Sequence, residues 1–313
     1  MPEKDTMKIR LWGVRGSIPC PGPKTVLYGG NTACIELRVG TDDRLIIIDA
    51  GSGIRLLGEH IMKNDMQKKG KIDADLFITH THWDHIMGFP FFIPLFIPST
   101  KLRIHGPVTY EDDTLDKIIG AQLSYRYFPV RHSELAADLN YTQLKECEMD
   151  LGGGLRMRTK YLNHPILCLG YRFEYKDKVF CTAYDTEPFR NVFPTDPEDP
   201  DYDEFAATEG ERAAKEENQK VQEFFQDADL LIHDSQYTQK EYLSSKLGWG
   251  HSSFEAAINN AHKAAVKKLL LFHHDPNRSD EDILKLEDLY FPRIKNKTDV
   301  DVEFAKEGME FVL

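Results

Sequence analysis

The sequence predicts an α/β protein in which buried strands alternate with helices. Short apolar runs rich in β-branched residues recur along the chain, and each ends in an acid or a histidine. Such runs are typical of strands buried on both faces by helices. Open sheets bind ligands at the carboxyl edge of their strands, so these polar ends are expected to share one site. The runs are 45–48 before Asp49, 76–79 before His80, 179–184 before Asp185, 230–232 before His233 and 269–272 before His273.

Helical signals lie between the predicted strands. A Gly-Ser-Gly turn at residues 51–53 leads into a helix that begins at Ile54. Prolines among acids predict an exposed loop over 193–208, because proline interrupts regular structure and the acids need solvent. A helix is expected to follow over about 209–225.

A further helix-start signal lies at Ser252. Ser252 and Glu255 form an S-x-x-E pattern, which predicts a capping box with Ser252 as the N-cap. The predicted helix runs through about Val266 and has lysines in its last turn, where positive charge favours a helix C-terminus. Strands and helices therefore alternate, as the α/β class requires.

The charge of the chain is negative and unevenly distributed. Lys and Arg number 39 against 51 Asp and Glu, which gives a net charge of -12. Residues 196–217 hold ten of the acids and two bases. No linker, repeat or low-complexity tract divides the chain, so we expect one domain over residues 1–313 with an acidic excursion at about 193–217. An acidic protein has the wrong sign to hold a long nucleic acid by counterion release.

Cysteine usage and the apolar runs indicate the compartment. The five cysteines include no CxxC pair, so neither a disulfide framework nor a Cys-type zinc module is expected. Met1–Leu11 lacks the apolar core of a secretory signal. The longest uncharged apolar run, Ile86–Pro98, is broken by prolines and is too short to span a bilayer. We therefore expect a soluble, cytoplasmic protein with no membrane partner.

The strongest functional signal is an H-x-H-x-D-H motif directly after a predicted strand. The motif carries His80, His82, Asp84 and His85. Burying three imidazoles and a carboxylate so close together is costly unless a ligand satisfies them, and a divalent metal does so. Imidazole with carboxylate suits zinc and similar ions. Four ligands exceed the needs of one ion with an open position, so two ions are expected. Surface or capping histidines are the alternative.

This motif is the signature of the metallo-β-lactamase superfamily, which the chain resembles over most of its length. Later elements follow the order of that family, with His164 in Asn-His-Pro, Asp185 in Ala-Tyr-Asp-Thr and His273 after the last apolar run. The resemblance implies an αββα sandwich of two mixed sheets flanked by helices. It also implies two divalent ions, most readily Zn2+, with Mn2+ or Fe2+ as alternatives. One ion would be held by His80, His82 and His164, the other by Asp84, His85 and His273, with Asp185 bridging the two.

Residues next to the predicted ligands have two interpretations each. Asp49 and Asp234 either accept a hydrogen bond from a ligand imidazole or cap a helix. His273 and His274 are adjacent, so alternation along a strand prevents both from facing the site. The family position favours His273 as the ligand and leaves His274 as a residue that reaches substrate.

A second motif indicates the reaction. The segment Gly248–Ser253 contains a Gly-His-Ser element that resembles the tRNase Z-like phosphodiesterase branch of the superfamily. The resemblance implies that His251 protonates the leaving oxygen, while Asp84 orients the attacking hydroxide. A solvated loop histidine is the alternative for His251.

Glycine-rich turns near the amino terminus resemble the same branch. The turns lie in Gly13–Pro19 and Tyr28–Thr32 and could bring backbone N–H groups to a phosphate oxygen. Ser17 and Asn31 are the candidate substrate contacts there, and Arg15 would be a natural phosphate partner. Ordinary hairpin turns are the alternative.

Together these features predict a dinuclear metal-dependent hydrolase, most readily a phosphodiesterase acting on a small phosphodiester such as a cyclic nucleotide. Only 20 residues separate His164 from Asp185, too few for the tRNA-binding arm that tRNase Z inserts there. With the acidic charge, this makes long nucleic acid a poor partner. A tRNase Z-type endonuclease on RNA, a lactone or thioester hydrolase, and a metal-binding module without turnover are the alternatives. The resemblance also implies a homodimer.

Overall fold

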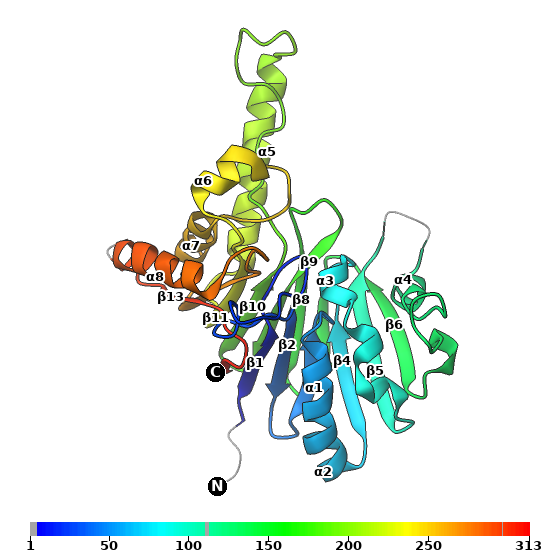
Figure 1. Cartoon of the computed structure of the whole chain (residues 1–313). Helices are drawn as coiled ribbons and strands as arrows, with labels where there is room; N and C mark the ends of the chain where they lie inside the picture. Colours follow the sequence, from blue (N-terminus) through cyan, green and yellow to red (C-terminus); the bar gives the residue numbers. More distant parts are fainter. Residues whose placement is uncertain (1–4, 110–112, 296) are drawn as a thin grey trace.

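Two mixed sheets pack face to face with helices on their outer faces, which confirms the expected αββα sandwich (Figure 1). The computed structural model describes residues 5–109, 113–295 and 297–313. The first sheet has the strand order β14 (Glu310–Val312), β1 (Met7–Gly13), β2 (Cys34–Val39), β3 (Arg44–Ile48), β4 (Ile72–Phe77), β5 (Thr100–Pro107) and β6 (Asp138–Leu144). The second has the order β13 (Asp301–Phe304), β12 (Lys268–Phe272), β11 (Leu230–Asp234), β10 (Lys178–Ala183), β9 (Cys168–Tyr175), β8 (Leu155–Leu162) and β7 (Glu148–Gly152).

Parallel pairing is concentrated where the predicted site lies. Strands β3 to β6 are parallel in the first sheet, and β10 to β13 are parallel in the second. The remaining pairs are antiparallel. Parallel strands end at the same edge, so the polar residues after β4, β10 and β12 are carried to one side of the sandwich.

The helices cover the two sheets separately. Apolar residues of α1 (Ile54–Ile61) pack on the outer face of the first sheet. Apolar residues of α5 (Glu204–Phe224), α7 (Phe254–Lys263) and α8 (Asp280–Ile294) pack on the second. The shorter helices are η1 (Met62–Met66), α2 (Gln67–Lys69), α3 (Trp83–Ile86), η2 (Phe89–Phe91), η3 (Ile93–Phe96), α4 (Leu115–Ala121), η4 (His132–Glu134), α6 (Gln239–Glu241) and η5 (Tyr242–Lys246).

The boundaries of α5 differ from the sequence expectation. The helix begins at Glu204 rather than at about 209. Asp203 is its N-cap, because the Asp203 carboxylate accepts a hydrogen bond from the Ala206 N–H at 2.7 Å. The acidic stretch is therefore part loop and part helix.

The expected capping box of α7 was wrong by one residue. The N-cap is Ser253, and the helix ends at Lys263, short of Val266. The Ser252 hydroxyl instead donates to the Thr186 carbonyl at 2.6 Å. Ser252 thus ties the loop before α7 to the end of β10, a tertiary contact that a local capping pattern does not reveal.

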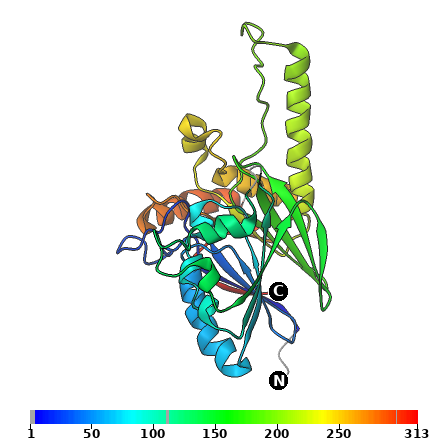
Figure 2. The ribbon, with the colours of Figure 1, turned by 90° about the vertical axis from the view of Figure 1, so that its right-hand side faces the viewer.

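The acidic excursion forms an arm that projects from the body of the molecule (Figures 1 and 2). The chain after β10 runs beside α5, where the Asn218 side chain pairs with both the N–H and the carbonyl of Phe189. The Asn191 amide also donates to the Ala207 carbonyl. Only a few α5 residues are buried, Val221 and Phe224 among them, near its junction with the second sheet. Over the described residues, no helix is long and apolar enough to cross a membrane.

Candidate metal centre

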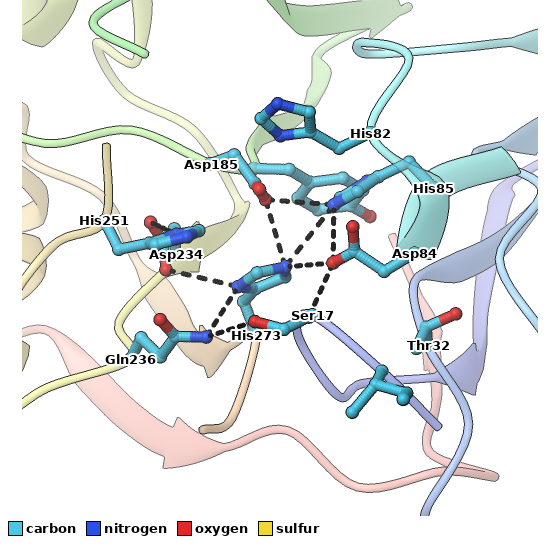
Figure 3. A network of polar contacts seen from close by, with 12 residues as sticks. Ser17, Thr32, His82, Asp84, His85, Asp185, Asp234, Gln236, His251 and His273 are labelled. Atoms are coloured by element: carbon cyan, nitrogen blue, oxygen red, sulfur yellow. Dashed lines mark hydrogen bonds and ion pairs between the residues drawn. The ribbon is translucent and has the colours of Figure 1, made fainter. Parts of the chain in front are cut away.

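The seven predicted ligands converge at one edge of the sandwich, from loops that follow strands of both sheets. Figure 3 labels five of them, His82, Asp84, His85, Asp185 and His273. The loops after β4, β8, β10 and β12 carry them, in the order His80, His82, Asp84, His85, His164, Asp185 and His273. The structure therefore brings together residues nearly 200 positions apart in the chain. Trp83, which opens α3 between two of the ligands, is exposed to solvent.

Polar residues at three of the strand ends adopt a left-handed backbone. The φ angle is 61° at Asp49, 40° at Asp185 and 65° at His273. Residues other than glycine rarely adopt positive φ, and such strain persists where the surrounding structure holds it, commonly at functional sites. In Figure 3 the side chains of Asp185 and His273 point from these turns into the shared centre.

One set of donors, the His82 group, consists of His80, His82, His164 and Asp185. His82 Nδ1 lies 3.0 Å from His164 Nε2, and His80 Nε2 lies 3.4 Å from Asp185 Oδ2. All donor atoms of the group lie within 4.8 Å of one another. Ligands at roughly 2 Å from one zinc ion have a comparable spacing.

The second set, the Asp84 group, consists of Asp84, His85, Asp185 and His273. Asp185 Oδ1 lies 3.1 Å from His85 Nε2 and 3.2 Å from His273 Nε2. Asp84 Oδ2 lies 3.1 Å from His273 Nε2. Because Asp185 turns Oδ2 to the first group and Oδ1 to the second, its carboxylate is placed to bridge two ions.

Buried atoms without partners indicate that the site fits metal ions. His80 Nε2 and Asp185 Oδ1 are both buried, and their contacts of 3.1 to 3.4 Å with the other donor atoms of the centre do not form hydrogen bonds among the described residues. Leaving such atoms unsatisfied is costly, and a divalent cation would satisfy them. The set of imidazoles and carboxylates, with no thiolate ligand, suits zinc and neighbouring ions.

The protonation states of three ligands, His82, His164 and Asp185, also favour metal binding. Burial lowers the pKa of His82 to about 4 and that of His164 to about 3, so these imidazoles are neutral and able to ligate at neutral pH. Burial raises the pKa of Asp185, but the imidazoles of His273 and His85 outweigh burial and hold this pKa well below its usual range. The bridging residue is therefore a carboxylate anion.

Asp49 braces the Asp84 group. Its Oδ2 accepts a hydrogen bond from His85 Nδ1–H at 2.7 Å, and its Oδ1 accepts from the Thr79 N–H at 2.7 Å. The N-cap of α1 is Gly53, so the capping interpretation of Asp49 was wrong. A carboxylate in this position fixes the ring of a ligand imidazole and raises its basicity.

Asp234 holds His251 beside both ligand groups. Asp234 Oδ2 accepts a hydrogen bond from His251 Nδ1–H at 3.1 Å. The His251 ring stacks on His273 with centroids 4.9 Å apart and lies 5.6 Å from the His164 ring. Burial lowers the pKa of His251, but the Asp234 carboxylate outweighs burial and raises this pKa to about 9. His251 is thus a positioned imidazolium and not a solvated loop residue.

Gln236 belongs to the site but was missed from the sequence. It is buried, and its Nε2 lies 3.5 Å from His273 Nδ1 and 3.4 Å from Ser17 Oγ. The Ser17 N–H donates to Asp84 Oδ2 at 2.6 Å, so the predicted glycine-rich turn does reach the centre through its backbone. No motif surrounds Gln236, and only the meeting of the two segments reveals it.

Two of the proposed substrate contacts point away from the centre. His274 is buried, and its Nε2–H donates to the Ala305 carbonyl at 2.7 Å. Asn31 donates to the Glu307 carboxylate at 3.0 Å and accepts from the Ser52 hydroxyl at 3.1 Å. Both expectations were wrong, because these side chains are used to join neighbouring segments of the fold.

Arg15 is a structural residue and not a phosphate partner. Its side chain is fully buried, and it donates to the carbonyls of Gly29 at 2.8 Å and Arg278 at 2.7 Å. The sequence pattern gave no sign of this burial. Of the amino-terminal candidates only Ser17, which is exposed, lies at the rim of the centre.

The loop that carries His251 is fastened to the site at several points. Glu187, just after β10, accepts hydrogen bonds from the Tyr242 hydroxyl at 2.9 Å and the Gly248 N–H at 3.0 Å. His164 Nδ1–H donates to the Gly250 carbonyl at 3.0 Å. A Cβ on Gly250 would lie 2.2 Å from His164 Nδ1, so glycine is required for this close approach.

Comparisons of sequence agree with this geometry. A family model described as the metallo-beta-lactamase superfamily matches residues 27–172. Ribonuclease Z of Thermoplasma acidophilum is 30% identical over 311 residues, with 90% of each chain covered. Ribonuclease Z of Lactococcus lactis subsp. lactis is 28% identical over 276 residues, which cover 78% of this chain and 83% of the relative.

Solved structures with similar folds extend over the whole chain. The metallo-beta-lactamase fold protein YhfI from Bacillus subtilis superposes with a TM-score of 0.64 at 18% identity, covering 99% of this chain and 100% of that one. The short form of human tRNase Z gives a TM-score of 0.59 at 17% identity, with 97% and 98% covered. A diphosphatase of the PhnP family gives 0.58 at 12% identity, with 97% of each chain covered. At these identities the similarity concerns the fold.

Proposed function

Because the chain belongs to the metallo-β-lactamase superfamily and is a metal-dependent hydrolase, we propose that it hydrolyses phosphodiester bonds with two divalent ions, most readily Zn2+. The observation that carries the proposal is the pair of ligand groups that share Asp185, with His251 held beside both. When bound, two such ions supply an activated water near neutral pH and positive charge for the phosphoryl oxygens.

Asp84 is assigned to orient the attacking water. Its carboxylate is fixed by the Ser17 N–H at 2.6 Å and lies 3.1 Å from His273 Nε2. A carboxylate oxygen held in this way accepts a hydrogen bond from the water and aims its lone pair at phosphorus. No other carboxylate of the Asp84 group has a backbone N–H donor of this kind among the described contacts.

His251 is assigned to protonate the leaving oxygen. Its Nδ1–H is bound to Asp234, so Nε2–H is the proton available to substrate. The ring is stacked over His273 and close to His164, which places it beside the edge that both ligand groups share. A general acid at this position contributes roughly 10²- to 10⁴-fold to the rate.

The charge distribution supports a small phosphodiester, such as a cyclic nucleotide, as substrate. Between His164 and Asp185 the chain forms only β9 and β10 and their connections, so no arm is inserted there. The arm that does project follows Asp185 and carries most of the excess negative charge. A negatively charged arm repels a long polyanion, whereas a small ester can enter beside it.

Cleavage of structured RNA is the second candidate. The ribonuclease Z relatives favour it, since their similarity extends over most of this chain. The two candidates share the same metal groups and the same general acid, and they differ in the size of the substrate. Substrate comparison therefore separates them.

A panel assay tests the proposal. Metal-loaded protein is given bis-p-nitrophenyl phosphate, cyclic nucleotides, a structured RNA with a 3′ extension and a lactone, and its metal content is measured in parallel. We expect two ions per chain and hydrolysis of the phosphodiesters, with the small esters turned over faster than the RNA.

The variant His251→Ala tests the assigned acid in the same assay. We expect its turnover of cyclic nucleotides to fall by about 10²-fold or more with metal content unchanged. Preferred cleavage of the RNA would select the second candidate, and hydrolysis of the lactone alone would refute a phosphodiesterase.

A further inference from the structure

Two cations without acid partners lie beside the loop that carries His251. Lys246 ends η5, and the Arg190 guanidinium lies near Gly248, 3.4 Å from the position that a Cβ on this glycine would take. Neither side chain forms an ion pair with an acid in the part of the chain that the structure describes. Lys246 lies instead against the rings of Trp249 and Tyr237. In a chain of net charge -12, two cations without an acid partner favour the binding of an anion at this surface.

An exposed tryptophan, Trp249, follows Lys246 by three residues in the chain. Trp249 is 56% exposed, although indole is costly to leave in water. The Lys246 Nζ lies 3.7 Å from the centroid of the Trp249 ring, which is a close cation–π contact. An exposed aromatic ring can stack on a nucleobase, and a cation beside the ring can attract the phosphate attached to that base.

This loop is rigidly connected to the reacting centre. The Gly248 N–H is bound to Glu187, and the Gly250 carbonyl accepts from His164. His251 is the next residue in the chain. His251, the proposed general acid, contacts the leaving oxygen. The loop residues that precede His251 in the chain therefore lie on the side of the leaving group.

We propose that Arg190, Lys246 and Trp249 form a subsite for the leaving group. These three residues together are called the 246–249 rim, after the segment that carries two of them. The leaving group that it accepts carries an aromatic base and a negative charge outside the bond that is cut. This inference rests on the proposed phosphodiesterase function and narrows its substrate to nucleotides with a second phosphate, such as cyclic dinucleotides.

The chemistry at this subsite is simple hydrolysis. The oxygen of water bonds to phosphorus, the bond from phosphorus to the leaving ester oxygen breaks, and the His251 proton ends on that oxygen. Water's own proton passes to solvent through Asp84. The rim takes no part in bond making; it binds the base by stacking and the second phosphate by charge.

Three substrates separate the rim from the reacting centre. Cyclic di-AMP is symmetric, so whichever ester bond is cut, the leaving nucleoside carries a base and a second phosphate. Cyclic AMP has a base but no second phosphate. Bis-p-nitrophenyl phosphate has neither a nucleobase nor a second phosphate. Its rate of hydrolysis therefore depends on the metal centre and the general acid and not on the rim.

The variants remove the charges and the stacking ring in turn. We expect the KM for cyclic di-AMP to rise about tenfold in the double variant Arg190→Gln/Lys246→Gln, because one or two charge-assisted contacts are lost. Trp249→Ala should raise the same KM by about tenfold through lost stacking. For bis-p-nitrophenyl phosphate, kcat/KM should stay within about twofold in each variant. Lys246→Arg should retain tight binding.

A matched control comes from the end of α7. Lys263 is exposed and also has no acid partner among the residues described, but it lies at the far end of the helix that follows the loop. Lys263→Gln removes one lysine charge, as the Lys246→Gln substitution of the double variant does. We expect Lys263→Gln to leave the KM for cyclic di-AMP unchanged.

The outcomes separate the two claims. If the wild type hydrolyses bis-p-nitrophenyl phosphate but the rim variants bind cyclic di-AMP as tightly as the wild type, the rim is refuted and the phosphodiesterase stands. Equal losses on all three substrates would also refute the rim, since they would indicate general damage. If the wild type hydrolyses no phosphodiester, the proposed function and the rim both fail.

Discussion

The two ligand groups are held by different means, and the Asp84 group is the more firmly braced. His85 donates to the buried Asp49 carboxylate at 2.7 Å. Asp84 accepts the Ser17 N–H at 2.6 Å, and Gln236 lies 3.5 Å from His273 Nδ1. Each ligand that belongs to this group alone therefore has a partner that fixes its orientation.

The His82 group relies on weaker, neutral partners. His164 donates to the Gly250 carbonyl, and His80 Nδ1 lies 3.1 Å from Thr79 Oγ1. Among the described contacts His82 has no bracing partner outside the centre. A carboxylate raises the basicity of the imidazole that it binds, and a carbonyl or a hydroxyl does so less.

The two sites are therefore expected to have different tasks. We expect the Asp84 group to hold its ion more tightly. We expect the His82 group, whose His164 is bound to Gly250 next to Trp249 of the 246–249 rim, to adjust when substrate binds. Metal affinities should therefore be unequal.

Asp185→Asn should have the largest effect, because it weakens both groups together. We expect bound metal to fall from two ions per chain to one or none, and kcat/KM to fall by more than about 100-fold. Elemental analysis and the bis-p-nitrophenyl phosphate assay measure this. A variant that keeps two ions and activity within tenfold of the wild type would contradict the bridging role.

Asp49→Asn should weaken metal binding by the Asp84 group alone. Loss of the carboxylate partner of His85 is expected to lower the affinity of the Asp84 group by about 10- to 100-fold. Titration against a competing chelator resolves the two affinities. The contrast fails if both affinities drop by the same factor.

Gly250→Ala should weaken metal binding by the His82 group. A Cβ there would press on His164 Nδ1 at 2.2 Å, so the affinity of the His82 group should fall by about tenfold while that of the Asp84 group is kept. Gly308→Ala is the matched control, since both glycines have positive φ but nothing lies within 4 Å of a Cβ on Gly308. Both variants bear the same backbone cost of about 1 kcal/mol. Identical metal affinities in the two variants would refute the steric argument.

Removing charge at the tip of the arm should have the smallest effect. Asp199 and Asp201 are exposed and lie on the arm that projects from the body of the molecule. The double variant Asp199→Asn/Asp201→Asn should hydrolyse cyclic nucleotides at a rate within about twofold of the wild type, because solvent and salt screen exposed charges. A steady-state comparison at physiological salt is sufficient. A fivefold change would show that the arm acts on the centre.

The α/β class and the metal-binding loop could be predicted because their signals are local, whereas the division of the ligands into two groups came from the resemblance to the metallo-β-lactamase superfamily. An H-x-H-x-D-H loop after a buried strand, and polar residues at later strand ends, need only short stretches of sequence. Asp49 was also found in this way, although its capping alternative was excluded only by the contacts of His85. The acidic excursion was predicted, but the sequence did not indicate that it would project from the body of the molecule as an arm.

The remaining features depend on contacts between distant segments. Gln236 and Glu187 follow strands without any motif, and their partners come from elsewhere in the chain. Histidine and arginine are common at functional sites, but His274 and Arg15 are buried here and donate hydrogen bonds to backbone carbonyls of other segments. Ser252 matched a capping pattern but is drawn to Thr186 instead.

Metal titration of the metal-free protein tests whether catalysis requires two ions. Zn2+ is added in steps while hydrolysis of bis-p-nitrophenyl phosphate is followed. The shared carboxylate of Asp185 predicts that activity stays low up to one ion per chain and rises to its maximum as the second ion binds. Full activity at one ion per chain, with no increase beyond it, would contradict a dinuclear phosphodiesterase.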